Sequence, residues 1–152
     1  MNCWLMKSEP DSFSIDDLQR RPRRIEPWDG VRNYQARNFM RQMQVGERAF
    51  FYHSSCDEPG IVGLMRVAAP AYPDPTQFDP KHHHYDPASK PQEPRWDLVE
   101  MQFERKLKRV ITLTELREHE RKLQGLQLLA RGNRLSIIPV KPAHWDYILG
   151  LE

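Results

Sequence analysis

Apolar residues fall in short runs along the chain, and these runs predict strands. The first run stops at Lys7-Ser8-Glu9-Pro10, where proline would remove a ladder donor, so we expect a buried strand just before it. Residues 49–53 are rich in aromatic side chains, which favour pleated, half-buried positions. Residues 99–103 alternate apolar and polar side chains, as in a strand with one buried face. The predicted strands are 3–6, 49–53, 61–67, 99–103 and 135–140.

A different period predicts the helices. Ala36, Phe39, Met40 and Met43 recur at i, i+3, i+4 and i+7, the spacing that places apolar side chains on one helix face. Other segments carry signals of a helix start or end. They are the acidic turn after Ser14, the capping box at residues 112–115, residues 123–130 before Gly132, and the first turn at Pro142.

Two segments are predicted to be loops. Residues 20–27 are basic and broken by proline, and residues 70–94 contain many prolines. A loop as long as the second is usually functional or mobile in a compact domain. The expected order of elements is β-α-α-β-β-loop-β-α-α-β-α, with no repeat and no linker that would split the chain. We therefore expect one α+β domain over residues 1–152, built on a small curved sheet or barrel.

Composition narrows the class of protein. Of the 152 residues, 39% are hydrophobic and 29% are charged, which is typical of a globular domain. A net charge of +2 permits nucleic-acid binding if the arginines gather on one face. The two cysteines form no C-x-x-C motif, which argues against a cysteine zinc site and a disulfide scaffold.

The same composition bears on location. No run approaches the ~20 apolar residues of a membrane span, and none resembles a signal peptide. We expect a cytoplasmic protein, with nucleoid association possible, that is not secreted and has no membrane partner. The sequence leaves the oligomeric state open.

One tract holds every kind of group that recognition of a nucleobase requires. A base stacks on an aromatic face, its polar edge needs fixed donors and acceptors, and its phosphate needs arginine or a helix N-terminus. The tract combines these with a glycine that lets a ligand approach the backbone. The candidate ligand-binding residues in it are Trp28, Asp29, Gly30, Val31, Arg32, Asn33, Arg37 and Asn38.

A structural role fits this tract equally well. Trp28 would then be a core residue, Asp29 a helix cap, and the arginines a solvated helix face. Both interpretations stay open on the residues alone.

Three further segments of the chain supply side chains that could bind a ligand. They are Lys7, Ser8 and Glu9 after the first strand, Tyr52, His53 and Ser54 at the end of the second, and Trp96 before the fourth. Adjacent residues of a strand point to opposite faces, which disfavours His53 and Ser54 as a nucleophile pair. We therefore assign no catalytic residue.

Three consecutive histidines, His82, His83 and His84, stand in the long loop. Consecutive histidines cannot easily converge on one ion, and no cysteine or glutamate stands nearby at ligand spacing. We expect an exposed loop here, no metal site and no cofactor.

Together the motifs resemble the EVE domain family. The run from Trp28 to Asn38 covers eleven residues, W-D-G-V-R-N-Y-Q-A-R-N, and is long enough to be specific. The remaining motifs follow in the family's order over nearly the whole chain, although the three histidines depart from its pattern. They are residues 4–10, 50–54, 59–63, 72–74, 94–96 and 134–136.

The resemblance implies a PUA-like fold, a small bent β-barrel decorated by short helices, related to ASCH and YTH domains. YTH readers hold a methylated base in an aromatic cage, with a Lys-Ser pair after their first strand. Lys7, Ser8 and Trp28 occupy similar places in this sequence. The implied partner is nucleic acid with a modified base, such as 5-methylcytosine or its derivatives in DNA, or modified RNA.

Three functions follow as hypotheses. The leading one is a binding module that holds a flipped, modified base in an aromatic-lined cleft. The alternative is an ASCH-like hydrolase acting on a nucleoside or small amide, with Lys7, Glu9 and His53 as acid–base candidates. The third is a protein-interaction domain that uses the proline-rich loop.

Overall fold

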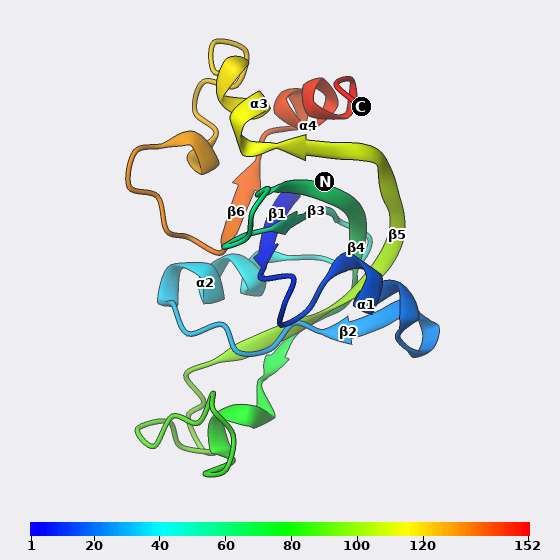
Figure 1. Cartoon of the computed structure of the whole chain (residues 1–152). Coiled ribbons are helices and arrows are strands. Elements are labelled where there is room, and N and C mark those ends of the chain that lie inside the picture. Colours follow the sequence, from blue (N-terminus) through cyan, green and yellow to red (C-terminus); the bar gives the residue numbers. More distant parts are fainter.

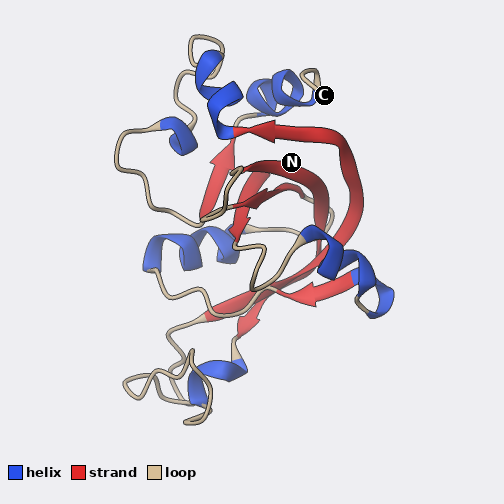
Figure 2. Ribbon diagram, in the orientation of Figure 1, coloured by secondary structure: helices blue, strands red, loops and turns tan.

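The computed structural model describes residues 1–152, which form one six-stranded sheet and four short α-helices (Figures 1 and 2). The strands are β1 (Cys3–Ser8), β2 (Ile25–Pro27), β3 (Arg48–His53), β4 (Gly60–Pro73), β5 (Asp97–Thr112) and β6 (Ile137–Val140). The helices are α1 (Ile15–Arg20), α2 (Tyr34–Gln42), α3 (Leu113–Glu118) and α4 (Pro142–Leu149). No helix has the length and apolar character needed to cross a bilayer.

The sheet has the strand order β2-β5-β4-β3-β1-β6 and bends strongly along its two longest strands (Figure 1). The pairing of β4 with β5 shifts register at several points, and such bulges increase local twist and bending. At one of them Gly63 packs against the Arg105 carbonyl, and a Cβ atom there would lie 2.9 Å from that oxygen. The edge strands β2 and β6 do not pair, so the sheet is open and the expected closed barrel is not confirmed.

Both faces of the sheet are covered, which explains why the early strands are continuous apolar runs. In β1, Trp4 and Met6 join one buried cluster with helices α1 and α2, whereas Leu5 joins the other. In β3, Phe51 and Phe50 are divided between the two clusters in the same way. The second cluster takes residues from α3 and α4, which lie together at one end of the molecule (Figure 1).

Helix starts are the local features that follow the sequence most closely. Ser14 and Asp17 form a reciprocal capping box at α1. Thr112 accepts a hydrogen bond from the Glu115 amide at α3, as the motif predicts. Segment 123–130, in contrast, holds only a short 3-10 turn at Gln127–Leu129.

The long loop is shorter and more ordered than expected, because β4 extends to Pro73 and a 3-10 turn covers Pro75–Phe78. The rest projects from the sheet at the end opposite α3 and α4 (Figure 1). The buried Gln77 amide donates to the carbonyls of Asp74 and Trp96, both at 2.7 Å. Its oxygen accepts from the Ser89 hydroxyl at 2.6 Å, so one buried side chain holds both ends of the loop together. The other predicted loop, 20–27, contains β2.

Candidate functional site

Three segments far apart in the sequence meet around a cavity of about 240 Å³ at the end of β1. Its lining includes seven of the candidate ligand-binding residues: Lys7, Ser8, Trp28, Asp29, Gly30, Val31 and Arg32. Lys7 and Ser8 end strand β1, where they pair with Tyr52 and His53 of the parallel strand β3. The tract that follows β2 forms the opposite wall.

Trp28 belongs to both the core and the cavity. Its ring lies edge-on to Phe13 and Phe51, with centroids 6.3 and 5.4 Å away, and only 8% of the residue is exposed. Its amide donates to the carbonyl of Val99 at 2.7 Å, which fixes the backbone of the tract against β5. The two interpretations that the sequence left open, core residue and pocket wall, therefore both apply.

Asp74 holds the tract in place from the start of the long loop. Its carboxylate is fully buried and accepts hydrogen bonds from the Gly30 amide at 2.8 Å and from Arg32 Nη1 at 3.1 Å. The amide and hydroxyl of Thr76 also donate to it, at 2.8 and 2.6 Å. Burial alone would raise the pKa of Asp74, but these donors together hold it below its ordinary value.

The polar groups of the cavity differ in how many hydrogen bonds they already make within the chain. The Ser8 hydroxyl donates to the carbonyl of Phe13 at 2.6 Å and keeps its lone pairs for a ligand. Burial lowers the pKa of Lys7, whose ammonium lies 5.9 Å from the ring centroid of Tyr52. Asp29 is exposed, and its carboxylate makes no hydrogen bond or ion pair within the chain. Lys7 and Asp29 thus offer one donor and one acceptor to an incoming molecule.

Several candidate residues lie outside the cavity lining because they support the fold instead. Asn33 caps α2 by accepting from the Ala36 amide at 2.9 Å. His53 accepts from the Ile15 amide through Nε2 at 3.1 Å, and burial lowers the pKa of its imidazole. Tyr52 is buried, which raises its pKa to about 12, and Ser54 bonds through its amide to the Ser8 carbonyl.

Glu9 is exposed and outside the lining. Of the three acid–base candidates of a hydrolase, only Lys7 lines the cavity, and Nε2 of His53 is occupied by the Ile15 amide. The geometry gives the hydrolase hypothesis no assembled catalytic group.

Trp96, Arg37 and Asn38 lie outside the cavity lining, along or beside a stack that begins at Arg32. The guanidinium of Arg32 lies 5.7 Å from the centroid of Trp96, which stacks on Tyr34 at 4.7 Å. The guanidinium of Arg37 lies over the ring of Tyr34, also 4.7 Å from its centroid. The Asn38 side chain accepts from Arg37 Nη2 at 2.9 Å.

This stack ends at a basic hollow of about 510 Å³. Arg37, Arg41, Lys90 and Arg95 line it, together with a single acidic residue, Glu93. Three arginines and one lysine are therefore gathered on one face, as a positive surface requires.

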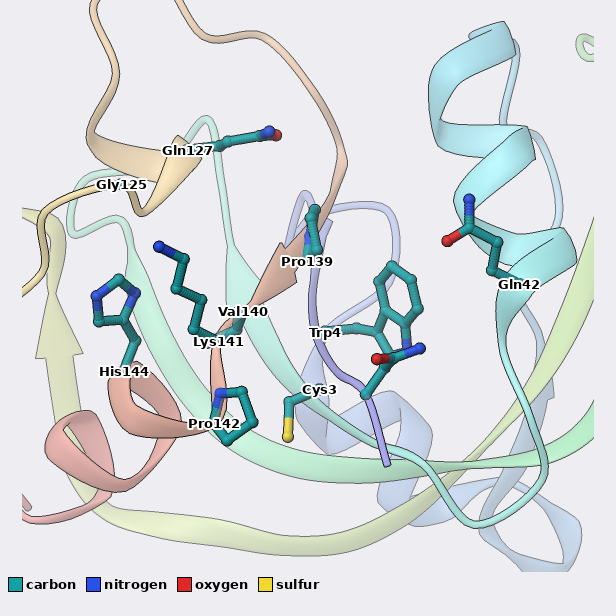
Figure 3. A pocket seen from close by; sticks show the side chains of 11 residues that line it. Cys3, Trp4, Gln42, Gly125, Gln127, Pro139, Val140, Lys141, Pro142 and His144 are labelled. Atoms are coloured by element: carbon teal, nitrogen blue, oxygen red, sulfur yellow. The ribbon is translucent and has the colours of Figure 1, made fainter.

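A second cavity, of about 380 Å³, lies at the other side of β1, where β6 joins α4 (Figure 3). Lys141 extends there toward the Gly125–Gln127 segment, and Trp4 forms part of the wall (Figure 3). The Trp4 indole is only 2% exposed and donates to Glu47 at 2.9 Å. None of the candidate ligand-binding residues lines this cavity, and its tryptophan presents no free face.

The geometry corrects one expectation about the loop. Consecutive histidines were expected not to converge, yet one ring nitrogen from each of His82, His83 and His84 lies within 4.8 Å of the others.

Sequence reasoning missed five residues of the site: Phe13, Glu26, Pro27, Ser136 and Asp74. Asp74 had a usable signal, since Asp74-Pro75-Thr76 is a helix-start motif in which the aspartate caps the following turn. The other four carried no signal of a role in this cavity, although Ser136 lies in the motif at residues 134–136, because only the folded sheet brings them to the end of β1.

The structure defines the protein as an α+β domain with a curved, open sheet and a small cavity at the end of its first strand. The chain belongs to the EVE domain family, whose match extends over residues 2–151. Human thymocyte nuclear protein 1 is 49% identical, covering 98% of this chain and 73% of its own length. A Schizosaccharomyces pombe protein described as uncharacterized is 41% identical, over 95% of this chain and 66% of its own length.

Solved structures agree with the family assignment. Human THYN1 in complex with DNA containing 5-methylcytosine superposes with a TM-score of 0.96 at 48% identity, covering 99% of this chain and 97% of that one. A protein from Pseudomonas syringae superposes with a TM-score of 0.93 at 48% identity, covering 98% of both chains.

These relatives overturn one expectation and leave two without support. The cytoplasmic location is contradicted, since the curated relatives from five vertebrates are called thymocyte nuclear protein 1. Neither RNA nor hydrolysis appears in what these relatives are said to bind or do.

Proposed function

We propose that residues 1–152 act as one module that binds DNA carrying 5-methylcytosine and holds the flipped methylated base in the cavity beside Trp28. The observation that carries this proposal is the likeness to human THYN1 bound to DNA of that kind, at a TM-score of 0.96 over 99% of the chain. A second observation supports the proposal: seven of the candidate ligand-binding residues, from separate segments of the chain, line one cavity.

The size and chemistry of the cavity support a single base as ligand. Its volume of about 240 Å³ is below the roughly 300–1,000 Å³ of pockets for drug-sized molecules. A flipped cytosine offers an amino donor and carbonyl and ring-nitrogen acceptors. In this proposal Asp29 accepts from the amino group, Lys7 donates to an acceptor, and Val31 and Trp28 receive the methyl group and ring.

The basic hollow supports a path for the DNA backbone. Arg37, Arg41, Lys90 and Arg95 would contact phosphates, and the stack of Arg32, Trp96 and Tyr34 connects them to the cavity. Phosphate contacts position the duplex and raise affinity for any sequence, whereas the cavity supplies the preference for the modified base.

The test compares binding of duplexes that differ only in one 5-methylcytosine, at a stated salt concentration. Base stacking on an aromatic side chain is worth about 1–3 kcal/mol, so Trp28→Ala is expected to weaken binding of the methylated duplex by roughly 5- to 150-fold. Because only the methylated base is proposed to occupy the cavity, the preference for methylated DNA should fall with it. Trp145→Phe is the control, because Trp145 is equally buried on the other face of the sheet. Thermal unfolding of each variant establishes that it is folded.

Asp29→Ala keeps the proposal testable if Trp28→Ala does not fold, since Asp29 is exposed and its carboxylate makes no hydrogen bond within the chain. We expect this variant to bind methylated DNA more weakly and to retain its stability. If both variants discriminate between the two duplexes as well as the unmodified protein does, the base does not enter this cavity.

A further inference from the structure

We propose that His82, His83 and His84 form a binding site for a divalent transition-metal ion such as Zn²⁺. Each contributes one ring nitrogen to a group whose members lie within 4.8 Å of one another. The ring centroids are 4.6, 5.0 and 3.9 Å apart for the three pairs, so the imidazoles form a compact cluster. Three imidazoles around one point are the protein ligands of many zinc sites that keep a fourth position for water.

A turn explains why consecutive histidines converge in this chain. The Tyr85 amide donates to the His82 carbonyl at 3.0 Å and closes a four-residue turn with His83 and His84 at its centre. The His82 amide donates in turn to the carbonyl of Asp79, also at 3.0 Å. Side chains alternate between faces only in a strand, so the objection that applies to extended histidine runs does not apply here.

Two ring nitrogens of the cluster differ in their bonds before an ion binds. Nδ1 of His82 accepts a hydrogen bond from the His84 amide at 3.0 Å, which places the proton on Nε2 in the neutral ring and fixes the ring's orientation. Imidazole binds metal ions as a neutral ring, so binding through Nε2 requires the His82 proton to move to Nδ1, and the hydrogen bond from the His84 amide is then given up. Nδ1 of His84 is buried and has no hydrogen-bond partner in the chain. The cluster therefore contains a polar ring nitrogen that the protein itself leaves unpaired.

The turn is anchored to the wall of the cavity rather than free. Arg32 donates to the His84 carbonyl through Nε at 3.1 Å and Nη2 at 2.8 Å. The His84 ring lies directly against Gly30, where any Cβ atom would overlap it. Preorganised ligands lose little conformational entropy on binding, which separates this cluster from a flexible polyhistidine segment.

The ligand type selects the class of ion. Imidazole suits Zn²⁺, Co²⁺, Ni²⁺ and Cu²⁺, whereas Mg²⁺ and Ca²⁺ prefer oxygen ligands. The site requires no DNA and does not depend on the proposed function. If that function is also correct, a bound ion would add positive charge beside Gly30 and Arg32, at the rim of the base cavity.

The experiment uses the full chain without an affinity tag. Zn²⁺ and Co²⁺ are titrated by calorimetry, and thermal unfolding is followed at increasing ion concentration. We expect one ion per chain and a Tm that rises with ion concentration, because an ion bound only by the folded turn stabilises the folded state. Tetrahedral Co²⁺ would also give the visible absorption of that geometry.

Two single variants and one control identify the ligands. His83→Ala removes an exposed ring, and His84→Ala removes a ring but keeps the backbone carbonyl that Arg32 uses. Each is expected to weaken binding by more than the roughly 10- to 100-fold that loss of an outer-shell partner costs. His119→Gln is the control, since His119 lies outside the cluster and bonds to Tyr147.

Two results would overturn the proposal. One is an ion-dependent rise in Tm that is as large in His83→Ala and His84→Ala as in the unmodified chain. The other is weak binding of ions to the unmodified chain with no rise in Tm, which is the behaviour of an unstructured histidine run.

Discussion

The carboxylate of Asp74 accepts a hydrogen bond from the amide of Gly30 at 2.8 Å, although the two residues are separated by 44 positions in the chain. This contact joins the start of the long loop to the wall of the cavity. The same carboxylate pairs with Arg32 at 3.1 Å, so a single buried charge positions two residues of the proposed base site.

Replacing Asp74 should destabilise the protein. Asp74→Ala leaves the Gly30 amide and the half-buried Arg32 without their partner, and Thr76 loses its cap. Removing one partner of a buried pair costs about 3–5 kcal/mol, and the partial exposure of Arg32 reduces this to an expected loss of about 2–4 kcal/mol. Urea denaturation measures it. Asp57→Ala, at an exposed carboxylate without a partner, should change stability by less than about 0.5 kcal/mol.

Gly30 should tolerate alanine less well than another glycine of the same backbone conformation. Gly30 has φ +76° and faces the His84 ring, whereas Gly132 has φ +74° and open space around it. Both substitutions carry the left-handed backbone cost of about 1–2 kcal/mol. Only Gly30→Ala also displaces His84, so it should be the more destabilising of the two in urea denaturation. The excess should disappear in the His84→Ala background, and an equal loss at both glycines would contradict the contact.

Contacts between the basic hollow and DNA phosphates should make DNA affinity depend on salt but leave the preference for the methylated base unchanged. If Arg95 contacts one phosphate, Arg95→Ala should lower the slope of log K against log salt by about 0.9. Affinity should fall equally for methylated and unmethylated duplexes, because phosphate contacts do not read the base. Fluorescence anisotropy over a salt series measures both. Arg20→Ala, on α1 and 76% exposed in its side chain, is the control that should leave the slope unchanged.

His53 predicts a loss of stability in mild acid. Burial lowers the pKa of its imidazole below the ordinary value of 6.5, and only the neutral ring accepts from the Ile15 amide. The unfolded chain therefore binds a proton at a higher pH than the folded chain does. Its contribution to stability is complete above pH 6.5 and is lost as the pH falls through the lowered folded pKa.

His53→Gln tests this, because an amide oxygen accepts a hydrogen bond but does not titrate in this range. The variant should lose less stability than the unmodified chain between neutral and mildly acidic pH, as measured by denaturation at each pH. Identical pH profiles would show that another histidine carries the effect.

Much of the fold could be predicted from the sequence because the relevant signals are local. The apolar runs of β1 and β3, the stripe of α2 and the caps at Ser14 and Thr112 depend on neighbours within a few positions. The extensions of β4 and β5 could not be predicted, since a strand's length depends on the pairing that a distant segment offers. The short strand β2 was missed for the same reason, because Ile25 is held by pairing with Gln102.

The proposed site divides in the same way. The sequence by itself determined which chemistry is present: a tryptophan, a glycine and arginines in one tract, and Lys7-Ser8 at a strand end. Only the tertiary structure decided which of these groups meet. It brought Lys7 and Trp28 to one cavity, occupied His53 and Asn33 with backbone contacts, and turned His82 to His84 into a cluster. Side-chain chemistry is a property of each residue, whereas convergence depends on long-range strand pairing and on buried bonds such as that of Asp74.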